Sequence, residues 1–244
     1  MFPVIQIGGL ALQTPGLILL VGIWVGLSLT ERYAKLTKVN TDQLYNLTFT
    51  MLVAGILGAR LAVMVRFPSA FIENPASTIS LNPNLLDPSG GLATALISGL
   101  VYGQRKGMKL WATIDALVPT MGVMGIAIPL ANLASGNAFG SPTELPWAIE
   151  IWGTTRHPTQ IYQALASSLI LWLVWPSRQG KKNTTGVLFI KYSALSAASI
   201  LILEAFRGDS VLILNGLRST QISAWIILAI SLWGYFSLLP PTKR

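Results

Sequence analysis

The chain has 244 residues, of which 52% are hydrophobic and 11% are charged, whereas soluble domains carry about 25% charged residues. It therefore lacks the polar surface that a water-soluble domain of this size needs, and the composition predicts an integral membrane protein. The net charge of +8 does not indicate a nucleic-acid partner, because the charged residues lie in short connections between apolar runs. The chain has no cysteine and one histidine, which excludes disulfides and argues against metal centres, and no cofactor is expected.

Apolar runs recur along the whole chain, and several approach the roughly 20 residues that a membrane-spanning helix needs. They predict an all-α membrane protein with about seven transmembrane helices, forming a single domain over residues 1–244. The third run is short, which predicts a tilted or partly re-entrant helix. No small-residue cleavage site follows the first run, so we expect it to be a retained helix. The predicted helices span residues 10–29, 44–65, 90–104, 110–134, 160–176, 187–204 and 219–239.

The Lys and Arg residues in the connections predict the orientation, because cytoplasmic loops are enriched in them. With the N-terminus outside, eleven of these residues face the cytoplasm and four lie in the outer connections 66–89, 135–159 and 205–218. These outer connections are longer than the inner ones and are expected to be irregular. The pattern predicts a multi-pass protein of the bacterial cytoplasmic membrane. The inner residues are Arg32, Lys35, Lys38, Arg105, Lys106, Lys109, Arg178, Lys181, Lys182, Lys243 and Arg244, and the outer ones are Arg66, Arg156, Arg207 and Arg218.

Polar residues inside or beside the apolar runs are the candidates for chemistry, because a charge in hydrocarbon costs about 2.5–3.5 kcal/mol or more. Arg60 lies late in the second helix, where its guanidinium either binds a phospholipid phosphate or extends to the outer interface. Glu204 and Arg207 are spaced to pair on one helix face, as a structural ion pair or to orient a bound headgroup.

His157 precedes the fifth helix, and it is either a general base or a group that packs at a helix start. Gly90 and Gly91 allow close backbone approach, either to another helix or to a ligand. Asp115 is expected to cap or pair near the inner side, and Asn132 to lie near the outer side, where it could face a polar cavity.

In order and spacing, several short motifs resemble the bacterial prolipoprotein diacylglyceryl transferase family over nearly the whole chain. The closest stretch is Arg156-His157-Pro158-Thr159-Gln160-Ile161-Tyr162. The others are Pro3-Val4-Ile5 with Gly8, Gly58-Ala59-Arg60-Leu61, Gly90-Gly91-Leu92, Asp115-Ala116-Leu117-Val118-Pro119, Asn132 to Phe139-Gly140, and Glu204-Ala205-Phe206-Arg207-Gly208-Asp209-Ser210 to Leu217-Arg218 and Gln221. The resemblance implies seven helices with the N-terminus outside. It also implies transfer of diacylglyceryl from phosphatidylglycerol to the cysteine of a lipoprotein precursor, with release of glycerol phosphate.

The chain also departs from the family pattern at positions that carry chemistry. Ser89 replaces the family histidine before the paired glycines, and Pro129 and Ile200 replace two arginines. Pro15 and Ser196 stand at tyrosine positions, and Asn137 stands at a glutamate position. The resemblance implies that the retained headgroup-binding set is Arg60, Gly90, Gly91, Asn132, Arg156, Glu204 and Arg207, with His157 as the one candidate base.

Two functions follow from this comparison with the family. One is a diverged, catalytically impaired member that binds a phosphatidylglycerol-like lipid or serves as a structural subunit beside other membrane proteins. The other is an active transferase that acts on a prolipoprotein signal peptide. A channel or transporter is poorly supported, because no ring of intramembrane charges or pair of broken helices is evident.

Overall fold

A computed structural model describes residues 4–7, 10–37, 39–79, 85–175, 185–213 and 216–238. The chain divides into two compact units, one formed by residues 1–37 and 114–244 and the other by residues 38–113. The prediction of one transmembrane domain over 1–244 stays a prediction.

In the part of the chain that the structure describes, seven long helices match the predicted runs in number and order. They are α1 (Thr14–Thr37), α2 (Thr41–Arg66), α4 (Pro88–Arg105), α5 (Leu110–Ser135), α6 (Thr159–Leu173), α7 (Val187–Leu203) and α8 (Ser219–Leu238). Among the described residues, α1, α2, α5, α7 with its continuation to Phe206, and α8 are long and apolar enough to span a membrane. The count of seven spans and the orientation of the termini stay predictions, because α6 has only 15 residues and α4 begins with a polar, glycine-rich turn.

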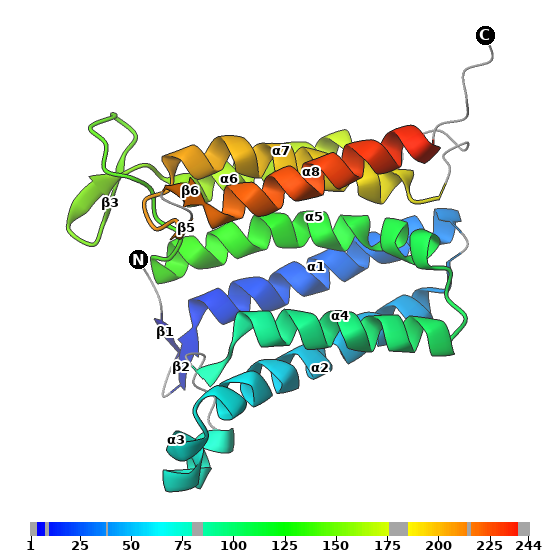
Figure 1. The fold of residues 1–244 in the computed structure, drawn as a ribbon, viewed down its shortest axis with the longest axis horizontal. Coiled ribbons are helices and arrows are strands. Elements are labelled where there is room, and N and C mark those ends of the chain that lie inside the picture. Colours follow the sequence, from blue (N-terminus) through cyan, green and yellow to red (C-terminus); the bar gives the residue numbers. More distant parts are fainter. Residues whose placement is uncertain are drawn as a thin grey trace. The chain divides into compact units, whose positions relative to one another are not determined.

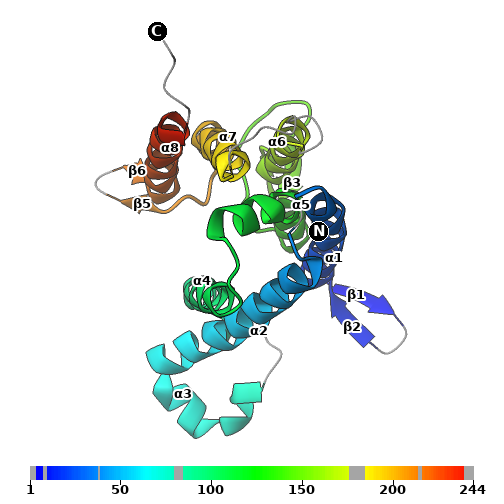
Figure 2. The same cartoon turned by 90° about the vertical axis from the view of Figure 1, so that its right-hand side faces the viewer.

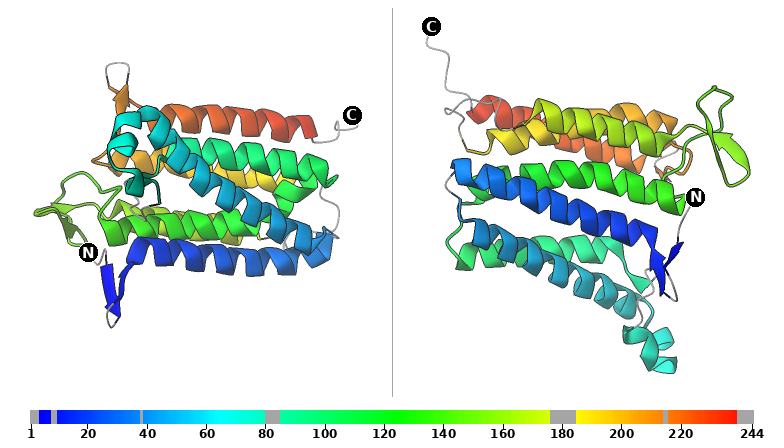
Figure 3. Two further views of the ribbon diagram at one scale, coloured as in Figure 1. Left: turned by 90° about the horizontal axis from the view of Figure 1, so that it is seen from below. Right: turned by 180° about the vertical axis from the view of Figure 1, so that it is seen from behind.

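The predicted bounds of the first helix, residues 10 and 29, were both wrong. Strands β1 (Val4–Ile7) and β2 (Leu10–Gln13) form an antiparallel hairpin in which Val4 pairs with Gln13, and this hairpin takes up the residues assigned to the helix start. α1 then continues to Thr37, because polar helix-forming residues prolong a helix after its apolar stretch ends. Figure 3 shows the hairpin extending from the start of α1. The predicted helix ends at residues 176 and 239 lie outside the described residues.

The unit of residues 38–113 is built on close packing of α2 against α4, which run side by side in Figures 1 and 2. A Cβ atom added at Gly58 would overlap the side chain of Thr94, and one added at Gly90 would lie 2.3 Å from the Cβ of Ala62. Small residues thus let the two helix backbones approach, as in membrane helix pairs. The short helices α3 (Pro68–Glu73) and η1 (Pro75–Ile79) follow α2.

In the other unit, α5 contacts its neighbours through small and polar residues. Gly22 and Gly26 of α1 face Ala127 and Thr120 of α5. The carboxylate of Asp115 accepts hydrogen bonds from the backbone N–H groups of Gly186 (2.5 Å) and Phe189 (2.8 Å), which satisfies donors at the start of α7. The prediction that Asp115 caps or pairs is therefore confirmed.

The connections predicted to be irregular contain regular structure. Strands β3 (Ile149–Ile151) and β4 (Thr154–Arg156) form a hairpin whose two turn residues, Trp152 and Gly153, have φ values of 56° and 71°. Positive φ at both positions is typical of a tight two-residue hairpin turn. Strands β5 (Leu212–Ile213) and β6 (Leu217–Arg218) form a third hairpin, after the turn η4 (Glu204–Phe206). Figure 1 shows β3, β5 and β6 at the same end of α5–α8.

Candidate functional site

The connection after α5 and the connection after α7 are held together by backbone hydrogen bonds. The N–H of Ser141 donates to the carbonyl of Phe206 (2.8 Å), and the N–H of Gly208 donates to the carbonyl of Phe139 (2.9 Å). The N–H of His157 in turn donates to the carbonyl of Ser141 (3.1 Å). Three segments far apart in the sequence therefore meet, and we call residues 137–143, 156–162 and 204–210 the loop cluster.

Two glycines make this approach possible. A Cβ at Gly140 would lie 2.2 Å from the carbonyl oxygen of His157, and one at Gly208 would lie 2.7 Å from the carbonyl oxygen of Gly140. Both obstructing atoms belong to backbone, so a rotamer change cannot relieve the overlap. The glycines of the Phe139-Gly140 and Arg207-Gly208 motifs are thus required by the packing of the loop cluster.

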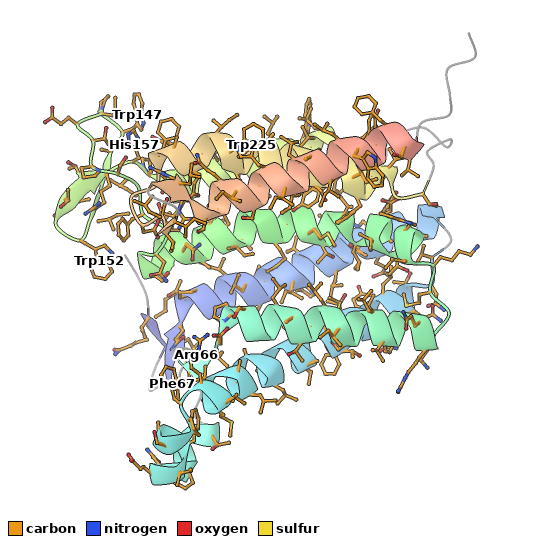
Figure 4. The ribbon with its side chains drawn as sticks, in the orientation of Figure 1. Arg66, Phe67, Trp147, Trp152, His157 and Trp225 are labelled. Atoms are coloured by element: carbon orange, nitrogen blue, oxygen red, sulfur yellow. The ribbon has the colours of Figure 1, made fainter. Side chains whose placement is uncertain are left out.

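His157 lies among aromatic side chains. Its ring packs edge-on against Phe206 with centroids 5.3 Å apart, and its Nδ1 lies 3.4 Å from the hydroxyl of Tyr162. That hydroxyl also accepts a hydrogen bond from the indole N–H of Trp147 (2.7 Å). Figure 4 shows Trp147 and His157 in the same loop region. The imidazole is half-buried and oriented, which fits both a packing role and a proton-accepting role.

Arg156 is held by backbone oxygen atoms. Its guanidinium donates to the carbonyls of Ile151 and Gly140 (both 3.3 Å) and lies over the ring of Phe139, 4.8 Å from the centroid. In the described part of the chain, no carboxylate forms an ion pair with Arg156. Its positive charge is therefore oriented but not neutralised.

Glu204 and Arg207 form the expected pair within a larger network. Glu204 is buried, with its Oε2 3.7 Å from Arg207 Nη1 and its Oε1 accepting from the Ser210 hydroxyl (2.7 Å). Arg207 also donates through Nε and Nη2 to Asp209 Oδ1, at 3.0 and 2.9 Å. Arg218 donates to the carbonyl of Arg207 (3.2 Å). Two carboxylates thus compensate the charge of Arg207.

Hydrogen bonds of amide groups connect the end of α5 to the loop cluster. Asn132 is half-buried, and its carbonyl accepts from the N–H of Asn137 (3.0 Å). Gln160 is fully buried and donates to the carbonyl of Asn137 (2.7 Å), while its own Oε1 has no hydrogen-bond partner among the described residues. Pro129 is buried on α5, where it removes one helical hydrogen bond.

In the unit of residues 38–113, Arg60 Nη1 donates to the carbonyl of Ser77 (3.0 Å) and thus ties α2 to η1. Gly90 and Gly91 lie in the contact between α4 and α2. That contact accounts for the glycine pair without a ligand, and a headgroup role for these three residues stays a prediction.

Ser89, one of the positions at which the resemblance implies a substitution, contributes to the cap of α4. Ser89 donates to the carboxylate of Asp87, which also accepts from the N–H of Gly90 (2.9 Å) and caps α4. The hydrogen bond from the Ser89 hydroxyl has the larger effect and the one from the Gly90 N–H the next, and both hold the pKa of Asp87 below its ordinary value. Arg66, labelled in Figure 4 at the end of α2, lies 3.2 Å from the same carboxylate. The other positions that the resemblance predicts to be substituted lie in the first turn of α1 (Pro15), after α5 (Asn137) and within α7 (Ser196 and Ile200), and their substitution stays a prediction.

Sequence reasoning did not predict the Asp87–Arg66 pair or the binding of Arg218 to the backbone beside Arg207. A signal for Asp87 was present, because Asp followed by Pro at the first helical position is typical of a helix N-terminus. Arg218 gave no comparable signal, since its partner lies 11 residues away across a hairpin.

Comparison with known proteins connects this arrangement to one family. A family model described as prolipoprotein diacylglyceryl transferase matches residues 3–237. The chain belongs to the prolipoprotein diacylglyceryl transferase family. The resemblance predicted from the short motifs is therefore confirmed.

Several relatives are named phosphatidylglycerol–prolipoprotein diacylglyceryl transferase. The one from Thermosynechococcus vestitus is 29% identical, over 96% of this chain and 91% of the relative. The one from Nostoc is 27% identical, over 94% and 86%, and the one from Finegoldia magna is 28% identical, over 92% and 90%. The similarity extends along nearly the full length of both partners in each case.

Proposed function

We propose that this member of the prolipoprotein diacylglyceryl transferase family binds a phosphatidylglycerol-like phospholipid and carries out diacylglyceryl transfer poorly or not at all. The observation that carries the proposal is the pair of ion pairs made by Arg207, because Glu204 and Asp209 compensate its positive charge. A guanidinium held by two carboxylates has less capacity to stabilise additional negative charge on a departing phosphate.

Two substituted positions support the same conclusion. Pro129 and Ile200 stand where the family pattern has arginines, and neither can donate a charged hydrogen bond. Removing one such donor commonly costs about 2.7–4 kcal/mol of barrier, so losing two would slow transfer by several orders of magnitude. Ser89 cannot act as a base in place of the family histidine, and its hydroxyl is already bound to Asp87.

Lipid binding needs fewer groups than catalysis does. Arg156 presents an uncompensated guanidinium in the loop cluster, and Asn132 is half-buried at the end of α5 that leads into it. Arg60 is the third candidate for a headgroup phosphate. The resulting role is a lipid-binding or structural protein of the bacterial cytoplasmic membrane, beside other membrane subunits.

The experiment measures binding and turnover on the same preparation. Purified protein is given phosphatidylglycerol and a lipobox peptide, and release of glycerol phosphate is followed while bound lipid is counted by native mass spectrometry. We expect bound anionic lipid that R156Q weakens and R156K retains, with turnover far below that of a motif-complete transferase. Absence of bound lipid in the wild type, or unchanged retention in R156Q and R60A, would contradict the binding proposal.

An active transferase is the second candidate, and it fits the family membership and the relatives' names at least as well. The observation in its favour is His157, which Tyr162 and Trp147 orient through a chain of hydrogen bonds. In this reaction His157 takes the proton of the cysteine thiol, and the thiolate sulfur attacks the glyceryl carbon. A carbon–sulfur bond forms as the carbon–oxygen bond to the phosphate breaks, and glycerol phosphate leaves.

The same assay separates the two candidates. Turnover near that of a motif-complete enzyme, abolished in H157A while bound lipid is unchanged, would establish the transferase and contradict the first proposal. Y162F is the matched variant, because it removes the hydroxyl that orients His157 and keeps the ring that packs against Phe206. A transferase that uses His157 should lose part of its rate in Y162F with little change in melting temperature.

The orientation in the membrane is tested separately by cysteine labelling, for which the absence of native cysteine is an advantage. Cysteines at Ser77 and Ser141 should react with an impermeant thiol reagent in intact cells. Asn215 should react as well and Asn183 should be protected, although both of these positions lie outside the described residues. Labelling at position 183 with protection of the other three positions would show that the orientation is the reverse of the predicted one.

A further inference from the structure

The hydroxyl of Tyr162 lies between the side chains of Trp147 and His157. The indole N–H of Trp147 donates to this hydroxyl (2.7 Å), and His157 Nδ1 lies 3.4 Å from it. An indole N–H can only donate, so the Tyr162 oxygen accepts from Trp147 and its own proton needs an acceptor. Among the described residues, His157 Nδ1 is the one acceptor within hydrogen-bond distance of that proton. Both groups are satisfied when Tyr162 donates to Nδ1.

This hydrogen bond decides which nitrogen of the imidazole carries the proton. A neutral imidazole has one N–H and one bare nitrogen, and the partner of one nitrogen selects the tautomer. Because Nδ1 accepts from Tyr162, the proton of His157 lies on Nε2. The reverse tautomer would give the Tyr162 oxygen two donors and leave its own proton without an acceptor in the described part of the chain. A general base that acts through Nε2 requires that reverse tautomer.

Aromatic packing holds the imidazole in this orientation. The rings of His157, Tyr162 and Phe206 pack edge-on against one another, with centroids 5.3, 6.1 and 6.2 Å apart. The backbone places Tyr162 in the first turn of α6, because its N–H donates to the carbonyl of Pro158 (3.1 Å). A ring packed against two neighbours cannot turn over to exchange Nδ1 and Nε2 without displacing one of them. Nε2 is therefore the nitrogen that stays available to a ligand.

The surroundings of Nε2 favour a negatively charged acceptor. Nε2 has no hydrogen-bond partner within the described ranges, and it is not fully buried. The two carboxylates of the loop cluster, Glu204 and Asp209, are both engaged by Arg207. The residue before His157 is Arg156, whose positive charge no described carboxylate compensates. An N–H donor next to an uncompensated cation suits an anionic oxygen, such as that of a phosphate.

We propose that Trp147 and Tyr162 hold His157 in the tautomer with its proton on Nε2, so that His157 donates a hydrogen bond to a phosphate oxygen. The inference rests on the proposed function, because the phosphate is that of the bound phosphatidylglycerol-like lipid. His157 then positions the head group and does not take the proton of a thiol. Free glycerol phosphate offers the same oxygen atoms as the lipid head group, so the experiment includes both sources.

The tautomer is measured by nitrogen NMR, for which the single histidine of the chain is an advantage. Full-length protein with isotope-labelled histidine gives one pair of ring-nitrogen signals, and couplings to the ring protons tell Nδ1 from Nε2. Spectra are recorded in detergent without added lipid at about pH 8.5, about two units above the ordinary histidine pKa. We expect the proton on Nε2. A proton mainly on Nδ1 would overturn the proposal.

Variants test whether the two aromatic side chains select the tautomer. Y162F removes the hydroxyl that donates to Nδ1 and keeps the ring, so the tautomer ratio should shift about tenfold towards that of free histidine. W147F should shift the ratio in the same direction by less, because the Tyr162 proton remains but is no longer directed. Y102F, which removes a tyrosine hydroxyl on α4, is the control and should change nothing. Equal ratios in wild type and all three variants would overturn the proposal.

Phosphate binding is read from the Nε2–H signal and from retained lipid. Phosphatidylglycerol should displace this signal, whereas diacylglycerol, which has the same chains and no phosphate, should not. Displacement by glycerol phosphate as well would assign phosphate alone as sufficient, and displacement by phosphatidylglycerol alone would assign the lipid-borne phosphate. In native mass spectrometry H157A should lower phosphatidylglycerol retention about tenfold. H157Q, whose amide N–H can replace the Nε2 donor, should recover most of it.

Failure of this proposal and failure of the proposed function are distinguishable. Absence of bound lipid would contradict the proposed function, whereas the tautomer is measured without lipid and is decided independently. Bound phosphatidylglycerol that leaves the Nε2–H signal unchanged, or equal retention in H157A and wild type, would overturn the role of His157 as a donor. Melting temperatures of all variants are measured first. If Y162F is misfolded, the comparison of W147F with Y102F decides.

Discussion

The loop cluster and the α2–α4 helix pair both depend on glycine, but for different physical reasons. At Gly140 and Gly208 the obstructing atoms belong to the backbone of another segment, whereas at Gly58 the obstructing atoms belong to the side chain of Thr94. The loop cluster must satisfy backbone hydrogen bonds between segments, while the helices of the pair already satisfy their own. The first region therefore tolerates little change, and the second has a side chain that can move.

The largest effect is expected from G140A. The added Cβ meets the backbone carbonyl of His157, so the two loops must separate and the hydrogen bond from Ser141 to Phe206 is strained. We expect a loss of free energy of unfolding of about 3 kcal/mol, the upper end of the range for overpacking. Thermal unfolding in detergent measures the loss. G16A, whose added Cβ meets nothing within 4 Å, is the control and should be neutral or stabilising.

The next effect tests whether charge also holds the loop cluster together. E204Q keeps the shape of the side chain but removes the negative charge of the carboxylate. That carboxylate faces Arg207 and accepts a hydrogen bond from the Ser210 hydroxyl. A hydrogen bond to a buried charged group contributes about 1.5–3 kcal/mol, and we expect a loss in this range. S210A should lose less, because it removes one hydrogen bond and leaves the ion pair. Equal stability of E204Q and wild type would show that backbone contacts alone hold the loop cluster.

A smaller effect is expected in the helix pair. G58A introduces a Cβ that overlaps Thr94, and a small displacement of α4 or of the Thr94 side chain can relieve part of the overlap. We expect a loss of about 1 kcal/mol, the lower end of the overpacking range. The double variant G58A/T94A should recover most of it. G103A on α4, where an added Cβ meets nothing within 4 Å, is the control in the same unit.

The smallest effect concerns pH. Because the pKa of Asp87 is lowered in the folded state, its contribution to stability is present above the unfolded pKa of about 3.9. That contribution is lost as the pH falls through the folded pKa. Melting temperatures measured from neutral pH down to acid pH should therefore show a decline below about pH 4 that D87N and, in part, S89A diminish. An identical pH profile in D87N would contradict this assignment.

The motifs predicted many residues of the candidate site, but they did not predict which contacts each residue makes. The pairing of Glu204 with Arg207 followed from their spacing of three residues. Asp209 and Ser210 stood in the same motif, yet only the turn after α7 brings them onto Arg207 and Glu204 and so compensates the cation. Gly90 and Gly91 were equally consistent with a ligand or a helix contact, and the contact with α2 accounts for them.

The sequence by itself determined the predominantly helical, apolar class, the order of the long helices and the family, because hydrophobic runs and the order of short motifs are local properties that require no knowledge of contacts. It misplaced the first helix, since apolar residues 10–13 fit a strand as readily as a helix until the partner strand is known. Only the tertiary structure decided which glycines allow close packing, which arginine is neutralised, and how Phe206 packs against His157. Each of these depends on atoms from segments distant in the sequence, and distances between such atoms are set by packing rather than by residue type.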